Sequence, residues 1–264
     1  MNQLYRRAIE SGILAGEAIM KIYEKDFKVE YKDDSSPLTE ADEIANSIIN
    51  SFLSSTEIPI ISEENKQLPY SVRKQWTSCW IVDPLDGTKE FIKKNDEFTV
   101  NIALVTNGIP QFGVIYLPAL RTLYYGDVAN RKSYRVLINR IEDTFETIEH
   151  NAVEINPSSK ENILRVVGSR SHMSIDTKEF INNLEDYSKK EIKIVSKGSS
   201  LKFCLVAEGK ADLYPRFAPT MEWDTAAGQA ICNAVGLLVL DVHTKKEMIY
   251  NKENLLNPYF IVSQ

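Results

Sequence analysis

The sequence is poor in the residues that build disulfide frameworks and metal–thiolate sites. It has three cysteines, Cys79, Cys204 and Cys232, and three histidines. The cysteines lie far apart, are odd in number and form no CxxC pair, so neither a disulfide framework nor a zinc site is indicated. A reducing cytoplasm is therefore the expected compartment.

Long apolar runs are also missing. No stretch approaches the roughly 20 apolar residues that a membrane helix needs, and we expect no integral membrane segment. The N-terminus, MNQLYRRAIESGILAGEAIM, lacks the apolar core and cleavage site of a signal peptide and is typical of an amphipathic helix. We expect a cytoplasmic protein, and peripheral attachment at the inner face of the membrane stays open.

Positive charge is in deficit. The chain has 37 acidic and 31 basic residues, for a formal net charge of −6. A long phosphate polymer would be repelled on average, so a nucleic-acid polymer is not an expected partner. A small anionic substrate is still allowed, because one pocket can be basic or metal-filled on an acidic surface. The oligomeric state stays open between monomer and homodimer.

Hydrophobic spacing predicts the elements. Apolar residues recur at helical spacing over residues 3–24, and a second helix is expected after Thr39, which resembles a capping pair with Asp42. Short strands are expected at 58–62 and 79–83, then an antiparallel meander over 98–139. Residues 140–162 are polar and weakly patterned. Strands and helices alternate after them, which predicts two halves, 1–150 and 151–264.

Four acidic residues stand where a strand ends or a helix begins: Glu63, Asp83, Asp86 and Asp224. In DPLDGT the turn after the strand can aim two carboxylates at one point. The amides of Gly87 and Thr88, if they open a helix, would form an anion cradle. Carboxylates that can hold a metal beside a phosphate-binding site are typical of enzymes of metal-dependent phosphoryl transfer. Taken alone, each segment is more often an ordinary turn or helix start.

The combination of these acidic segments, in this order along the chain, is more specific than any one of them. SEE at 62–64, WIVDPLDGTKEFI at 80–92 and WDTAAG at 223–228 resemble the three metal-site motifs of the inositol monophosphatase superfamily, and SPLTEAD at 36–42 resembles the segment before them. GSRSH and GSSLKFCLVAEGKADLYPRF, with the extended DGTKEF segment, are similar to its 3′(2′),5′-bisphosphate nucleotidase branch. Gln229 stands where many relatives of that branch have His, and Asp96 where Gly is common.

The resemblance implies a layered α/β or α+β fold, a two-part αβαβα sandwich with a mainly antiparallel first sheet and a mixed second sheet. The first half would bind the metal. The second would complete the metal site and bind the nucleoside end. Two or three Mg²⁺ ions would be held by Glu63, Asp83, the Leu85 carbonyl, Asp86 and Asp224. The catalytic residues implied are Asp42, Glu63 and Thr88, with Thr88 and Asp42 orienting the attacking water.

Substrate contacts are implied as well. The residues implied to bind substrate are Leu85, Asp86, Gly87, Thr88, His172, Ser199, Lys202, Arg216 and Asp224. The implied activity is hydrolysis of the 3′-phosphate of adenosine 3′,5′-bisphosphate and of its sulfated form, by direct water attack and with sensitivity to Li⁺. The alternative for Lys202 and Arg216 is a solvated surface charge, and the binding role is favoured. The alternatives are an inositol or sugar phosphatase of the same fold and, in another class, a non-catalytic nucleotide-sensing or protein-binding subunit.

Overall fold

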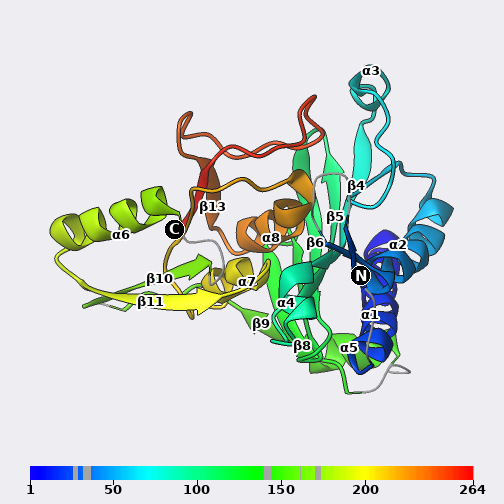
Figure 1. The fold of residues 1–264 in the computed structure, drawn as a ribbon, viewed down its shortest axis with the longest axis horizontal. Helices are drawn as coiled ribbons and strands as arrows, with labels where there is room; N and C mark the ends of the chain where they lie inside the picture. The colour runs from blue at the N-terminus through cyan, green and yellow to red at the C-terminus, as the bar shows by residue number, and fades with distance from the viewer. Residues whose placement is uncertain (26–28, 32–36, 140–143, 161, 170–173, 264) are drawn as a thin grey trace.

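Two helices form the first layer of the fold (Figure 1). The computed structural model describes residues 1–25, 29–31, 37–139, 144–160, 162–169 and 174–263. α1 (Gln3–Tyr23) and α2 (Glu40–Leu53) pack side by side and bury their apolar stripes against the first sheet. α2 begins with the predicted cap, because the Thr39 amide donates to Asp42 Oδ2 at 2.8 Å and the Ala41 amide donates to Thr39 Oγ1.

Seven strands form the first sheet, in the order β3-β4-β5-β6-β7-β8-β9. β3 is parallel to β4, and every other neighbouring pair is antiparallel. Helices cover both faces, which explains why β4 and β5 are apolar along most of their length. The strands are β3 (Ile60–Ser62), β4 (Ser78–Asp86), β5 (Thr99–Thr106), β6 (Ile109–Leu117), β7 (Thr122–Asp127), β8 (Lys132–Leu137) and β9 (Val153–Ile155).

The third layer consists of α7 (Leu201–Ala207) and α8 (Glu222–Ala234), which lie between the two sheets. α8 crosses β4 to β7 at close range. A Cβ atom at Gly113 on β6 would lie 2.3 Å from the Ala227 carbonyl oxygen, so only glycine permits this approach. The close packing fixes the first turn of α8 beside the end of β4.

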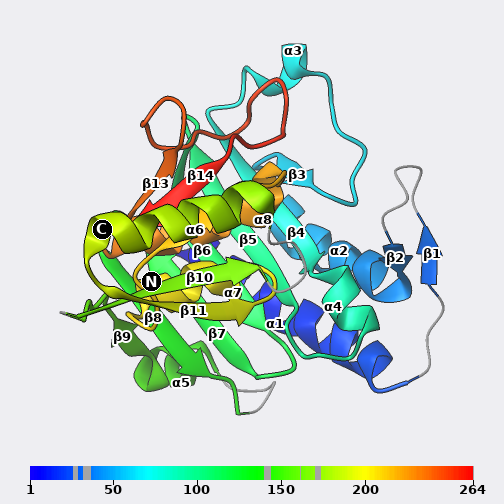
Figure 2. The ribbon, with the colours of Figure 1, turned by 60° about the vertical axis from the view of Figure 1, so that its left-hand side comes forward.

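A second sheet and one helix complete five layers. β10 (Ile163–Ser169) and β11 (Glu191–Lys197) are parallel, whereas β12 (Tyr214–Arg216), β14 (Phe260–Ser263) and β13 (Leu238–Asp241) are antiparallel. A parallel bridge between Val166 and Leu213 joins the two groups into a mixed sheet. α6 (Ile175–Ser188) covers its outer face, as Figure 2 shows. The predicted αβαβα order is confirmed.

The remaining elements are short. They are the hairpin β1 (Val29–Tyr31) and β2 (Pro37–Thr39), the 3₁₀ turn Ser54–Thr56, α3 (Tyr70–Arg73), α4 (Thr88–Ile92) and α5 (Phe145–Asn151). Residues 140–162 were expected to be weakly patterned, yet they contain α5 and β9, and β9 extends the first sheet past residue 150. The division into halves at 150 stays a prediction. No helix among the described residues is long and apolar enough to span a bilayer.

Candidate active site

A bulge at the end of β4 brings the two aspartates of DPLD to one side. Asp83 pairs with Asn101 and Asp86 with Thr99, so β4 carries one residue more than β5 between these pairs. Residues three apart on a regular strand point to opposite faces, and the extra residue of a bulge cancels that alternation. Pro84 is tolerated at this irregularity because it has no ladder hydrogen bond to lose. The predicted convergence therefore has a backbone cause.

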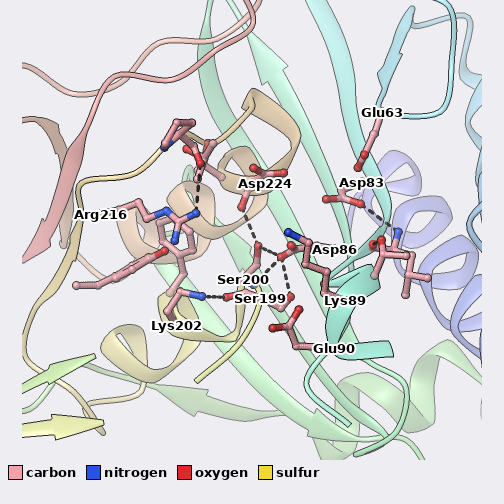
Figure 3. Close-up of a pocket in the computed structure, with 18 residues that line it drawn as sticks. Glu63, Asp83, Asp86, Lys89, Glu90, Ser199, Ser200, Lys202, Arg216 and Asp224 are labelled. Atoms are coloured by element: carbon pink, nitrogen blue, oxygen red, sulfur yellow. Dashed lines mark hydrogen bonds between the residues drawn. The ribbon is translucent and has the colours of Figure 1, made fainter. Parts of the chain in front are cut away.

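Asp224 reaches the same point from α8. It is the third residue of that helix, and its Oδ2 accepts a hydrogen bond from the Met221 amide at 2.8 Å. One carboxylate oxygen from each of Asp83, Asp86 and Asp224 lies within 4.8 Å of the others. These three residues are the predicted ligand set of the second cation, and the structure brings them together as Figure 3 shows.

Glu63 directly follows β3, the strand that lies parallel to β4. Its amide donates to the Val82 carbonyl at 3.1 Å, which fixes the corner beside Asp83. The side chain lines the same cavity and lies next to Asp83 in Figure 3. The corner is held from behind, where Ser62 Oγ donates to Asn46 Oδ1 at 2.8 Å.

The acidic cluster is electrostatically strained. Asp83 is 1% exposed. Burial raises its pKa well above the ordinary range, and repulsion from Glu63, Asp86 and Asp224 adds to the effect. Burial and then repulsion from Asp86 raise the pKa of Asp224 to about 8. Crowded carboxylate oxygens are the hard donors that Mg²⁺ or Ca²⁺ prefers, so the residues present fit a divalent cation.

Thr88 and Asp42 meet at the edge of the cluster. Asp42 is 2% exposed, and its Oδ2 is occupied by the Thr39 amide and hydroxyl. Its Oδ1 lies 3.3 Å from Thr88 Oγ1, which also lies 3.3 Å from the Leu85 carbonyl oxygen. Gly87 precedes α4 with φ of +92°, a conformation that favours glycine. The Thr88 hydroxyl therefore faces one buried carboxylate and one carbonyl predicted to bind a cation.

Lys202 and Arg216 form the basic wall of a cavity of about 400 Å³. Lys202 is buried, donates to the Ser199 carbonyl at 2.5 Å and lies over the Tyr214 ring. Burial lowers its pKa to about 8. Arg216 donates to the Pro219 carbonyl at 3.2 Å, and its buried Nε has no hydrogen-bond partner among the described residues. Both residues line the cavity, whereas His172 lies outside the described residues.

Sequence reasoning missed two residues of the site. Thr99 and Asn101 on β5 are buried, at 0% and 1% exposure, and both approach Asp86 Oδ2 at 3.4 Å. Their signal is present in TVNIALV, where two polar residues at a spacing of two interrupt an otherwise apolar strand. Such residues share one face of a strand, and here that face meets the site.

Two departures from the expected pattern have local explanations. Asp96 has φ of +64°, which explains why glycine is common there, and its Oδ1 accepts from the Tyr23 hydroxyl at 2.8 Å. Gln229 is wholly buried, donates to the Met248 carbonyl and accepts from Tyr250 Oη. Neither belongs to the acidic cluster.

Comparison with known proteins adds to this geometry. The sequence model described as the inositol monophosphatase family matches residues 1–262. The 3′(2′),5′-bisphosphate nucleotidase CysQ of Salmonella typhimurium strain LT2 is 43% identical over 253 residues, covering 94% of this chain and 95% of that protein. Its counterpart of the same name in Escherichia coli strain K12 is 42% identical over the same shares.

Solved structures agree with the sequence matches. CysQ from Bacteroides thetaiotaomicron, described as a bacterial member of the inositol monophosphatase family, superposes with a TM-score of 0.87 at 45% identity, covering 98% of this chain and 96% of that one. The extragenic suppressor protein SuhB of Bartonella henselae is 21% identical with a TM-score of 0.75, covering 99% and 94%, and shares the fold.

Proposed function

This chain belongs to the inositol monophosphatase family, and from that premise we propose that it is a 3′(2′),5′-bisphosphate nucleotidase. It would remove the 3′-phosphate of adenosine 3′,5′-bisphosphate, and of the sulfated form of that nucleotide, by direct attack of water. One observation carries the proposal. The cavity that holds the converging carboxylates of Asp83, Asp86 and Asp224 also holds the cations Lys202 and Arg216. Relatives at 42–43% identity carry the nucleotidase name.

The acidic cluster is proposed to hold two or three Mg²⁺ ions. Glu63, Asp83 and the Leu85 carbonyl would hold one, and Asp83, Asp86 and Asp224 a second. When bound, such ions supply positive charge that raises the acidity of water and stabilises the oxygen of the leaving group. They would also offset the burial and the mutual repulsion that raise the pKa values of Asp83 and Asp224.

Thr88 and Asp42 are proposed to orient the attacking water. The Thr88 hydroxyl has one proton and two acceptors at 3.3 Å, Asp42 Oδ1 and the Leu85 carbonyl. If the Leu85 carbonyl holds a cation, the Thr88 hydroxyl donates its hydrogen bond to Asp42, and a lone pair of Thr88 Oγ1 is left to accept a hydrogen bond from the attacking water. Asp42 stays in place for this role because two donors from Thr39 hold its other oxygen.

The two ends of the substrate are proposed to meet different elements. The amides of Gly87 and Thr88 would receive the phosphate that is removed. Lys202 and Arg216 would meet the 5′-phosphate, as charge-assisted donors. Arg216 lines the cavity, and its buried Nε has no hydrogen-bond partner within the described part of the chain. Ser199 and His172 are proposed contacts of the nucleoside end.

The product of the reaction tests this proposal. Adenosine 3′,5′-bisphosphate incubated with the protein and Mg²⁺ should yield adenosine 5′-monophosphate and one equivalent of phosphate, resolved by ion-exchange chromatography. A chelator should stop the reaction, and added Mg²⁺ should restore it. Release of adenosine 3′-monophosphate would reverse the proposed orientation of the substrate. Turnover that persists in the chelator would contradict the cation site, and no turnover would favour a nucleotide-binding subunit.

The cellular compartment and the oligomeric state of the protein are also proposals. The described cysteines are free and buried, as suits a protein kept in a reducing cytoplasm. A monomer or homodimer stays a prediction.

A further inference from the structure

One oxygen of Asp86 is the focus of a part-buried polar cluster that links the end of β4 to the turn before α7. Asp86 Oδ2 lies 2.6 Å from Ser199 Oγ, 2.7 Å from the Ser200 amide nitrogen and 2.7 Å from Ser200 Oγ. Figure 3 shows these contacts below the acidic cluster. No donor among the described residues is recorded on Oδ1 of the same carboxylate. Asp86 is therefore held by one oxygen, and the other stays available.

The Ser200 hydroxyl also contacts the residue that contributes the facing carboxylate. Its oxygen lies 2.7 Å from Asp86 Oδ2 and 2.7 Å from the Asp224 carbonyl oxygen, so its single proton is shared between these two acceptors. On its other side it accepts a hydrogen bond from Asn101 Nδ2 at 2.9 Å. Ser200 is 3% exposed and Asn101 is 1% exposed, so water does not compete for these contacts. One hydroxyl thus touches the end of β4, the first turn of α8 and the inner face of β5.

The turn that carries Ser200 is itself fixed. The Gly198 amide donates to Glu97 Oε2 at 2.8 Å, and Lys197 pairs with Glu97 Oε1 at 3.0 Å. Lys202 donates to the Ser199 carbonyl. Ser199 has φ of +52°, a left-handed conformation that a non-glycine residue keeps only where its surroundings enforce it. The turn is held in an unfavourable conformation that points its donors at Asp86.

We propose that Ser200, supported by Asn101, is a positioning residue for the cation ligands Asp86 and Asp224. It anchors Asp86 through Oδ2 so that Oδ1 faces the cation, and it fixes the start of α8 relative to β4. This inference rests on the proposed function only for the assignment of Asp86 and Asp224 as ligands. The neighbouring Ser199 hydroxyl also contacts Asp86 and lies 2.5 Å from Thr99 Oγ1. A substrate contact by Ser199 would use this same hydroxyl.

Direct titration with Mn²⁺, followed by electron paramagnetic resonance without substrate, tests the inference. Ser200→Ala removes the hydroxyl and keeps the amide. Loss of a group that orients a metal ligand typically weakens metal affinity by about 10- to 100-fold. We expect that loss in Ser200→Ala at the site that Asp224→Asn abolishes. We expect recovery in Ser200→Thr, which restores the hydroxyl. Activity of Ser200→Ala should need more Mg²⁺ and should rise again at high Mg²⁺.

Ser133→Ala is the matched control. Ser133 is wholly buried, and its hydroxyl donates to the Ile231 carbonyl at 2.8 Å, so it also links the first sheet to α8. Within the described ranges its hydroxyl makes no hydrogen bond to a carboxylate, and its removal should leave Mn²⁺ affinity unchanged. Should Ser200→Ala fail to fold by circular dichroism, Thr99→Val removes a weaker contact to Asp86 at nearly constant volume. We expect a several-fold loss of affinity there.

The outcomes distinguish a failure of the positioning role of Ser200 from a failure of the proposed cation site. Unchanged Mn²⁺ affinity in Ser200→Ala, or in Thr99→Val where that variant replaces it, would overturn the positioning role while leaving the cation site intact. An equal loss in Ser133→Ala would overturn it too, because the effect would then be a general loss of packing. A wild-type protein with no Mn²⁺ site sensitive to Asp224→Asn would overturn the proposed cation site itself.

Discussion

Replacing Asp83 by asparagine should abolish turnover and stabilise the metal-free protein. Asp83 is buried at the centre of the acidic cluster, where desolvation and three neighbouring carboxylates raise its pKa well above the ordinary range. Asparagine has nearly the same shape, and its Oδ1 can still accept the Leu85 amide, which donates to Asp83 at 3.1 Å. The substitution therefore removes a charge and keeps the turn.

The sign of the stability effect follows from the raised pKa. On folding, the metal-free protein must either ionise Asp83 in a buried acidic cluster or keep a proton that the unfolded chain has lost. Above the unfolded pKa of about 3.9 the native state therefore binds more protons, and stability falls as pH rises toward the folded pKa. Asp83→Asn lacks this linkage. We expect its free energy of unfolding in chelator to exceed the wild-type value by about 1–3 kcal/mol at pH 7.5.

Urea unfolding in chelator from pH 5 to pH 8 measures this difference, which should widen with pH. In Mg²⁺, kcat should fall by at least about a thousandfold, roughly 4 kcal/mol of barrier. Asp176→Asn is the control, because Asp176 is an exposed aspartate in the first turn of α6. Its stability should change by less than about 0.5 kcal/mol. Activity of Asp83→Asn within tenfold of wild type, or wild-type stability at every pH, would refute the reasoning.

Three further predictions concern the water, the second phosphate and the cation. Thr88→Ala should lower kcat by about a hundredfold or more at nearly constant KM, and a rise in KM alone would make Thr88 a binding residue. Arg216→Ala should lower kcat/KM for adenosine 3′,5′-bisphosphate by about 10- to 100-fold but leave adenosine 3′-monophosphate nearly unaffected; equal losses would assign Arg216 to the fold. In chelator, raising pH from 5 to 8 should lower Tm, because the Asp224 pKa of about 8 lies above its unfolded value. Stabilisation by Mg²⁺ should grow over the same range, and the opposite trend would contradict the cluster.

Much of the fold could be predicted because its elements carry clear periodic patterns. The helical stripe of α1, the Thr39–Asp42 cap and the four strands of 98–139 were expected where they occur. The elements within residues 140–162 were not predicted, because α5 and β9 are short and largely polar. β9 is a strand because it pairs with β8. Hydrophobic spacing carries no signal for such a strand.

The acidic cluster could be predicted in composition but not in geometry. The order of Glu63, Asp83, Asp86 and Asp224 at element ends indicated a shared site, and the resemblance supplied their roles. The bulge that turns Asp83 and Asp86 to one side is a property of β4 pairing with β5. The contact of Ser200 with Asp86 spans more than a hundred residues and depends on how the two sheets pack around α7 and α8. Local sequence does not encode these long-range positions.

Substrate choice tests the central claim most directly. The measurement is phosphate release from adenosine 3′,5′-bisphosphate, inositol 1-phosphate and fructose 1,6-bisphosphate at matched concentrations, each with Mg²⁺ and with chelator. We predict the highest kcat/KM for the nucleotide and no release from any substrate in chelator. A higher kcat/KM for either of the other two substrates would contradict the nucleotidase assignment and identify a phosphatase of the same fold with another substrate.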